Sequence, residues 1–187
     1  MTSNRTILIT GVTGKQGGAV AQALQGTGFY LRGLTRKPNS ERAATLARRG
    51  VDIVKGDLDD EATLRRALAG AWGVFGVQNT LEAGVEREEA QGKRLATLAR
   101  EAQVEHYVYT SVGSAHKQTG VPHFDNKWRI EETVRGLRFP SHVILRPVFF
   151  MENLVAPNAG GGRRYPDEGA GPANCVRTDA NRTGAAV

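Results

Sequence analysis

The sequence predicts an α/β fold in which a parallel sheet carries helices on both faces. Short aliphatic runs alternate with helix-like segments along residues 6–145, and the connections between them are short. One run, Gly73 to Val77, is small and apolar throughout, which is typical of a buried parallel strand. A glycine-rich turn joins the first predicted strand to the first predicted helix. At 187 residues, the chain is long enough for one domain with a substantial core.

The first half of the chain follows this alternation closely. An aliphatic run stops at Gly11, and an Ala/Val/Leu pattern with helical spacing follows it. Ser40 is the expected N-cap of the next helix, with Glu41 in its first turn, and Gly50 closes that helix. We expect strands at about 6–10, 30–36 and 51–54, and helices at 17–24 and about 41–49.

The second half continues in the same way. Asp59 or Asp60 is expected to cap a helix that ends before Gly70. In the long helix that follows the fourth strand, the residues from Glu86 to Glu89 place acidic groups in the first turn. We expect strands at about 73–77, 106–111 and 142–145, and helices at about 60–69, 85–102 and 125–135.

The character of the sequence changes near Pro157. From there to Val187 we find no helical or strand periodicity and almost no large apolar residue. Such a segment buries too little surface to offset the entropy of ordering it. We therefore expect a domain over 1–156 and an irregular, disordered Gly/Arg/Pro-rich tail over 157–187. A disordered tail is the simplest interpretation, and a sharper one is that the natural chain was cut or shifted here.

Composition excludes several classes of function. The net charge is +6, but the basic residues are mixed with acids and form no arginine-rich run, so we expect no direct nucleic-acid binding. Cys175 is the only cysteine, so neither an internal disulfide nor a cysteine metal cluster is expected, and the histidines lack metal-ligand spacing. Without a signal peptide or a membrane-length apolar stretch, a cytoplasmic protein without a membrane partner is expected.

The turn after the first strand has the spacing expected of a pyrophosphate site. Gly11 permits a sharp turn, Gly14 removes a Cβ where phosphate approaches, and Gly17 lets helix and strand pack closely. The helix N-terminus supplies free N–H groups and a positive dipole. The spacing differs by one residue from the common G-x-G-x-x-G pattern, but its place at the first strand favours a Rossmann-type, doubly wound dinucleotide domain.

The end of the second strand indicates which dinucleotide is bound. This position normally contacts the adenosine ribose, where an acid favours NAD and an arginine accommodates the 2′-phosphate of NADP. Arg36 occupies it here, with Lys37 beside it and no acid at this position. A solvated basic turn is the alternative interpretation. We expect NADP as cofactor, with NAD as a second possibility.

The catalytic residues are the weakest part of the pattern. Related domains often carry a Tyr-x-x-x-Lys pair after the fifth strand, but His123 stands four residues before Lys127 here. These two are the candidates for proton transfer; alternatively, His123 is a surface residue before the helix and Lys127 only holds a ribose. Tyr107 and Tyr109 are interpreted as packing residues. Ser111 is either ligand-facing or simply the end of its strand.

Several motifs taken together resemble the NmrA-like proteins, atypical members of the short-chain dehydrogenase/reductase superfamily. The resemblance extends from Thr6 to about Leu154 and is closest to the redox-sensor branch, which also has His-Phe-Asp-x-Lys. The matching motifs are GVTGKQGG at 11–18, TRKP at 35–38, GDLDD at 56–60, HFDNK at 123–127 and LRPVFFMEN at 145–153.

The resemblance implies a set of cofactor contacts. The glycine loop would wrap the pyrophosphate, Arg36 would meet the 2′-phosphate, and Lys127 would hold the nicotinamide ribose. Sensor relatives often have a second basic residue where Ser40 stands, a role that Lys37 would take here. The full set of expected cofactor-binding residues is Gly11, Thr13, Gly14, Lys15, Gln16, Gly17, Arg36, Lys37, Asp57, Leu58, Gln78, Asn79, Thr80, Lys127, Phe150 and Asn153.

Three functions are compatible with these motifs. The first is a redox-sensing regulator that binds NADP(H) without turnover and responds through a protein partner. The second is an NADPH-dependent reductase of the quinone or isoflavone type. The third is an inactive fragment, because the resemblance implies a substrate- or partner-binding region after Asn153 that only the tail replaces.

Overall fold

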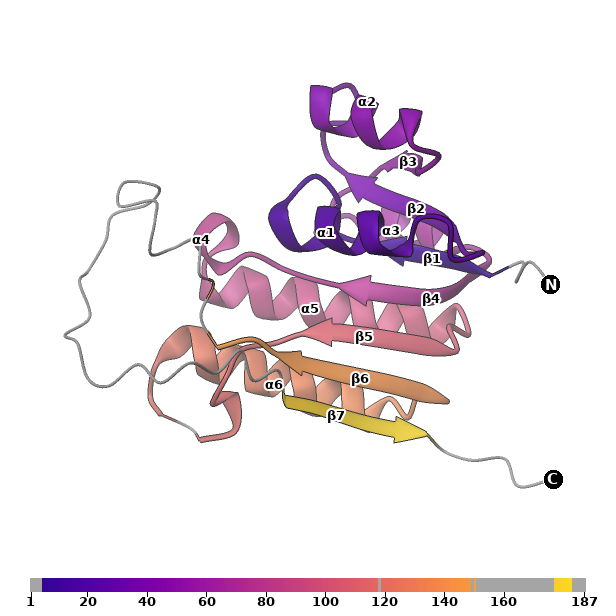
Figure 1. Ribbon diagram of the computed structural model, residues 1–187. Coiled ribbons are helices and arrows are strands. Elements are labelled where there is room, and N and C mark those ends of the chain that lie inside the picture. The colour runs from indigo at the N-terminus through magenta and orange to yellow at the C-terminus, as the bar shows by residue number, and fades with distance from the viewer. Residues whose placement is uncertain (1–4, 118, 149, 151–176, 183–187) are drawn as a thin grey trace, which may run out of the picture.

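The computed structural model of the chain describes residues 5–117, 119–148, 150 and 177–182. Within these residues one seven-stranded sheet runs in the order β3-β2-β1-β4-β5-β6-β7 (Figure 1). The strands are β1 Thr6–Ile9, β2 Tyr30–Thr35, β3 Asp52–Lys55, β4 Ala71–Gly76, β5 His106–Thr110, β6 Ser141–Arg146 and β7 Arg177–Arg182. The first six are parallel, and β7 pairs antiparallel with β6.

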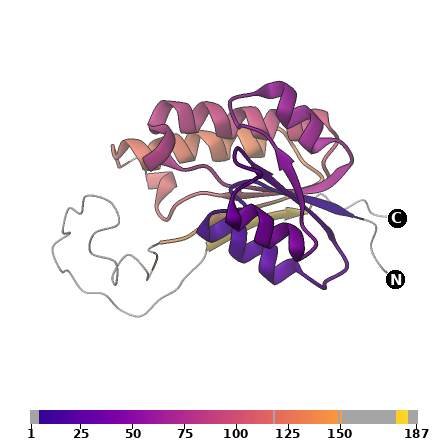
Figure 2. The same ribbon diagram turned by 90° about the horizontal axis from the view of Figure 1, so that it is seen from above.

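Helices cover both faces of the sheet. They are α1 Lys15–Leu24, α2 Glu41–Arg48, α3 Glu61–Leu68, α4 Thr80–Ala83, α5 Val85–Glu101 and α6 Pro122–Gly136, with a 3₁₀ turn at Ala115–Lys117. Figure 2 shows α1 and α2 on one face, and α3, α5 and α6 on the other. The predicted Rossmann-type, doubly wound α/β fold is confirmed.

Strand alternation divides the core into two clusters. In β5, Tyr107 and Tyr109 point into the larger cluster, beneath α3, α5 and α6, where both are fully buried. Val108, between them, packs against the smaller cluster, which also contains Ala21 of α1 and Leu46 of α2. Successive side chains of a strand point to opposite faces, so one strand serves both clusters. The two tyrosines are packing residues, as predicted.

Successive strands are added to the sheet first on one side of β1 and then on the other. The chain builds β1, β2 and β3 outward on one side and then returns to place β4 on the other side of β1. The Thr10 hydroxyl joins the two strands there, because it accepts a bond from the Val77 N–H (2.8 Å) and lies 3.0 Å from the Val77 carbonyl, to which it donates. In open α/β sheets, ligands bind outside the carboxyl ends of the strands at such a reversal.

The structure corrects several predicted boundaries. Helix α1 begins at Lys15, two residues earlier than expected, and α6 begins at Pro122, three residues earlier. Proline suits the first turn of a helix, because its missing N–H has no partner there in any case. The four-residue helix α4 was not predicted, since it is too short to show a helical period.

The expectation of an irregular tail is wrong for residues 177–182. They form β7, which extends the sheet beside β6 with the register Ser141↔Arg182 to Arg146↔Arg177. The sequence RTDANR has no alternation of apolar and polar residues that would predict a strand. An edge strand can form through backbone hydrogen bonds to its neighbour, which do not require such a pattern. The remainder of the tail lies outside the described residues.

Two predicted helix caps are present. The Ser40 hydroxyl accepts from the Ala43 N–H (3.3 Å) at the start of α2. At α3 the two candidate caps are resolved in favour of Asp60, whose Oδ1 accepts from the N–H groups of Ala62 (2.9 Å) and Thr63 (3.2 Å). No helix of the described residues is both long enough and apolar enough to cross a bilayer.

Removal of the α3 cap provides a test of local stability. We expect Asp60→Ala to lower the free energy of unfolding by about 1 kcal/mol, because two N–H groups lose their acceptor. Urea unfolding of the variant and the original chain measures this difference. An unchanged midpoint would mean that Asp60 does not cap α3 in solution.

Candidate functional site

The loops that follow β1, β2, β3 and β4 meet at one edge of the sheet, because these strands are neighbours and parallel. This edge brings together the predicted residues from Gly11 to Gly17, Arg36 and Lys37, Asp57 and Leu58, and Gln78 to Thr80. Lys127 lies on α6, which follows β5. Phe150, after β6, is 42% exposed, and Asn153 is outside the described residues.

The glycine loop leaves no space for side chains at the predicted positions. Gly11 has φ +58°, a conformation that favours glycine. A Cβ at Gly14 would lie 3.1 Å from the Gly11 carbonyl oxygen, and a Cβ at Gly17 only 2.4 Å from the same atom. The backbone of α1 therefore packs directly on the loop that precedes it. This geometry is the close helix–strand approach expected at a pyrophosphate site.

The N-terminus of α1 is open to an anion. Its N-cap, Gly14, has no side chain that could cap the first turn. The N–H groups of Lys15, Gln16 and Gly17 have no acceptor within the helix, as for any first turn. These N–H groups, with the positive end of the helix dipole, offer a pyrophosphate its usual partners.

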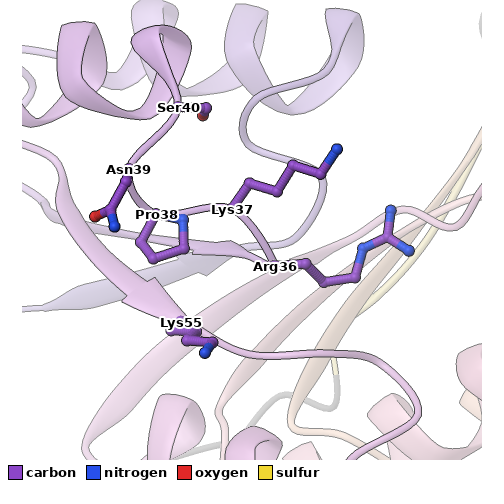
Figure 3. A pocket seen from close by; sticks show the side chains of 6 residues that line it. All are labelled: Arg36, Lys37, Pro38, Asn39, Ser40 and Lys55. Atoms are coloured by element: carbon purple, nitrogen blue, oxygen red, sulfur yellow. The ribbon is translucent and has the colours of Figure 1, made fainter.

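A basic pocket lies beside this loop, after β2 and β3 (Figure 3). Figure 3 shows the Arg36 and Lys37 side chains extending to the same side, away from Asn39. Lys55 adds a third cation, because the register pairs it with Thr35, the residue before Arg36. Sequence reasoning missed Lys55, which lies at the end of a short strand. The pocket is lined by Arg36, Lys37, Pro38, Asn39, Ser40 and Lys55.

Arg36 has a partner within the chain. Its guanidinium forms an ion pair with Glu82 of α4, so the side chain reaches from the β2 loop to the segment after β4. The hydrogen bond to Glu82 raises the pKa of Arg36 above its usual value. Both side chains are about half exposed, and such pairs add little stability. A more strongly charged anion could therefore replace Glu82 at low cost.

A second pocket lies between the glycine loop and α2. Arg42 of α2 reaches into this region, where its Nη1 donates to the Thr13 carbonyl (3.2 Å). Arg42 is thus a further cation within reach of the loop. Sequence reasoning missed Arg42, because α2 has the pattern of an ordinary amphipathic helix.

Gln78 carries a polar group that the protein leaves unsatisfied. Its side chain is only 6% exposed, yet neither Nε2 nor Oε1 has a hydrogen-bond partner among the described residues. Buried amides are normally paired, and leaving one unpaired costs free energy. A ligand at the carboxyl ends of β1 and β4 would supply the partners, so this residue fits a bound dinucleotide.

Two neighbouring predicted residues have structural roles. The Asn79 Oδ1 accepts from the Leu81 N–H (3.1 Å) and caps α4. The Asp57 Oδ1 accepts from the Asp59 N–H (3.0 Å), a turn that shapes the loop after β3. Both side chains therefore stabilise the loops that form the carboxyl edge.

Lys127 and His123 lie one turn apart on α6, so their side chains share a helix face. The Lys127 Nζ donates to Glu88 Oε1 at 2.7 Å. His123 is half-buried within the first turn of α6 and packs edge-on against Phe124. The interpretation of His123 as a residue before the helix is therefore wrong.

Among the described residues, no tyrosine takes the place of the tyrosine that reductases use. Burial raises the pKa of Tyr107 above its usual value. Burial, and then the charge of Glu88, raises the pKa of Tyr109 in the same direction. Both hydroxyls lie in the core without a hydrogen-bond partner among the described residues. Neither group can act as a proton donor at the carboxyl edge.

Ser111 is not a ligand-facing residue. It is 4% exposed, and its hydroxyl donates to Glu131 Oε1 at 2.5 Å. Glu131 of α6 also accepts two bonds from Arg146, at the end of β6 (2.9 and 2.6 Å). The serine therefore fastens β5 to α6, and its position after the strand reflects packing.

The comparisons with known proteins agree with this arrangement. The model of the NmrA-like family matches residues 3–167. An NmrA-like family domain-containing oxidoreductase of Cladobotryum sp, FrzB, is 33% identical over 177 residues, covering 87% of this chain and 53% of its own length.

Two solved structures share the fold. The NADPH-dependent quinone oxidoreductase QOR2 from Escherichia coli, complexed with NADPH, superposes with a TM-score of 0.69 at 26% identity, over 82% of this chain and 53% of the enzyme. The negative transcriptional regulator NmrA, in complex with NAD, superposes with a TM-score of 0.66 at 25% identity, over 75% of this chain and 44% of the regulator.

The chain spans about half the length of the curated relatives it matches. The family match, in contrast, extends over most of the chain and includes every loop at the carboxyl edge described above. By its sequence and its fold, the chain belongs to the NmrA-like family.

Proposed function

We propose that the chain binds NADP(H) at the carboxyl edge, with NAD as a weaker ligand. The observation that carries this proposal is the position of Arg36, Lys37 and Lys55 around one pocket beside the glycine loop. In a Rossmann domain this position receives the adenosine ribose, and cations there favour a 2′-phosphate. Relatives of the chain have been crystallised with NADPH and with NAD, which supports the same ligand class.

The proposed contacts combine this geometry with what the family resemblance implies. The pyrophosphate lies on the first turn of α1, where the N–H groups of Lys15, Gln16 and Gly17 point. The 2′-phosphate takes Arg36 from Glu82, since a dianion attracts the guanidinium more strongly than a half-exposed carboxylate does. Gln78 gains its missing partners from the cofactor. By the family resemblance, Asp57 and Leu58 flank the adenine, Asn79 and Thr80 border a ribose, and Lys127 and Phe150 belong to the nicotinamide end. Asn153, expected there too, is outside the described residues.

Calorimetric titration of Arg36→Ala tests this proposal. We expect its affinity for NADP⁺ to fall about tenfold or more, the loss expected for one charge-assisted hydrogen bond. Affinity for NAD⁺ should change little, because NAD⁺ lacks the 2′-phosphate. Arg48→Ala, an exposed arginine of α2 outside the pocket, is the matched control and should behave like the original chain. Equal losses for both dinucleotides would contradict the assignment of Arg36.

We further propose that the protein reports the NADP(H) redox state to a protein partner without turning a substrate over. Two observations favour this function. Histidine stands where reductases have the catalytic tyrosine, and the Lys127 ammonium is already engaged by a buried carboxylate. Tyr107 and Tyr109, the nearest phenols in sequence, are enclosed in the core.

An NADPH-dependent reductase is the second candidate. Its support is that relatives at about a third identity carry the name oxidoreductase and that one structural neighbour is a quinone oxidoreductase. Steady oxidation of NADPH with simple quinones, abolished by Lys127→Ala, would establish this function. Tight NADP⁺ binding with no quinone-dependent oxidation would favour the sensor.

A further inference from the structure

One of the fully buried charges near the carboxyl edge belongs to Glu88, in the first turn of α5. Its side chain is fully buried, and both carboxylate oxygens are engaged. Oε1 accepts from the Lys127 Nζ (2.7 Å) and Oε2 from the Asn126 Nδ2 (2.9 Å), while the Thr80 hydroxyl also donates to Oε2. A buried carboxylate is costly unless it is paired and hydrogen-bonded in this way.

The partners of Glu88 come from separate parts of the chain. Thr80 begins α4, in the segment after β4, whereas Lys127 lies on α6, after β5. These two segments follow the neighbouring strands β4 and β5 at the carboxyl edge. One carboxylate therefore fixes the distance between them.

Helices α5 and α6 also pack closely one turn away from this contact. A Cβ at Gly92, one turn after Glu88, would lie 2.6 Å from Ile130 Cδ1, so the two helices touch there with no space for a side chain. Ile130 is three residues after Lys127 on α6. The ion pair between Lys127 and Glu88 therefore lies next to a tight contact between the two helices.

We propose that Glu88 is a positioning residue that holds Lys127 and Thr80 in place for the nicotinamide half of the cofactor. The inference rests on the proposed binding of NADP(H). An ammonium group has three N–H donors, and Glu88 takes one of them in a fixed direction. The Lys127 side chain keeps 11% exposure, whereas the Glu88 side chain has none. Ordering both groups before the ligand arrives lowers the entropic cost of binding.

Glu89, the next residue on α5, forms an ion pair that links the helices without contacting the proposed cofactor residues. It joins the same two helices through Arg129 of α6 (2.7 Å), but at the surface, with a side-chain exposure of 18%. It also binds Lys93 along its own helix (2.7 Å). Glu89 contacts none of the residues expected at the cofactor, which makes it the matched control.

Two ligands separate positioning from general damage to the fold. NADP⁺ contains both the adenosine half and the nicotinamide half of the cofactor, whereas adenosine 2′,5′-bisphosphate contains only the adenosine half. For Glu88→Gln in the full chain we expect affinity for NADP⁺ to fall about tenfold, while affinity for the bisphosphate changes less than about twofold. Glu89→Gln should leave both affinities unchanged. Calorimetric titration measures all of them.

A second variant tests whether weaker binding by Glu88→Gln comes from loss of the fold. Glu88→Gln combined with Lys127→Met removes both buried charges, so the fold is preserved and the thermal midpoint stays close to that of the original chain. This double variant should still bind NADP⁺ weakly and the bisphosphate normally.

The outcomes distinguish the two proposals. If the original chain binds neither ligand, the proposed function fails, and this inference fails with it. If the original chain binds both ligands and Glu88→Gln weakens both equally, or neither, the role of Glu88 alone is overturned.

Discussion

Replacing Gly17 by alanine is expected to lower the free energy of unfolding by about 3 kcal/mol and to abolish measurable cofactor binding. The new Cβ would lie 2.4 Å from the Gly11 carbonyl oxygen and 2.7 Å from that of Thr10. Both neighbours are backbone atoms of the loop that follows β1, so no side-chain rotation relieves the contact. The helix must move away, and the phosphate-binding N–H groups move with it.

Gly18→Ala is the matched control in the same helix. Its Cβ would approach only the Val12 carbonyl oxygen, at 3.3 Å, and alanine is the better helix former by about 1 kcal/mol. We expect a change of less than about 1 kcal/mol in unfolding and near-normal binding of NADP⁺. Urea unfolding and titration of both variants give the comparison. Equal stability of the two variants would mean that α1 does not pack on the loop as described.

The first six strands were predictable because each is a short aliphatic run with a turn signal after it. Boundaries were less certain, because hydrogen-bond ladders continue past the apolar residues. Strand β3, for example, ends on Lys55, a charged residue that the pattern assigned to a loop. Helix α4 and β7 carry no periodic signal at all. A four-residue helix completes scarcely one turn, and β7 exists through its pairing with β6.

Some residues of the candidate site could be predicted from the sequence and others could not. Residues whose role depends on backbone conformation, such as Gly11 and Gly17, were predictable from their spacing. Buried charges were not. The acids from Glu86 to Glu89 look like a solvated first turn, yet Glu88 is fully buried, because α6 packs over it. Burial is a property of the packed helices, which the local sequence does not reveal.

The second large effect is expected for Arg146→Met, which removes a buried partner of Glu131. Glu131 is fully buried, and the Arg146 side chain is 8% exposed. The guanidinium donates to both carboxylate oxygens, at 2.9 and 2.6 Å. Removing one member of a buried pair typically costs 3–5 kcal/mol, so we expect a loss of about 3 kcal/mol because Ser111 and Arg135 still bind the carboxylate.

The double variant Arg146→Met, Glu131→Leu shows whether the loss comes from a buried charge. With no carboxylate left in the core, it should be more stable than Arg146→Met alone, since apolar pairs often replace buried ion pairs without cost. Urea unfolding of the two single variants and the double variant completes the cycle. Lys127 lies one turn before Glu131 on α6, so weaker NADP⁺ binding should accompany the loss of stability. A double variant no more stable than Arg146→Met would show that the ion pair positions α6 through its geometry and not only through its charge.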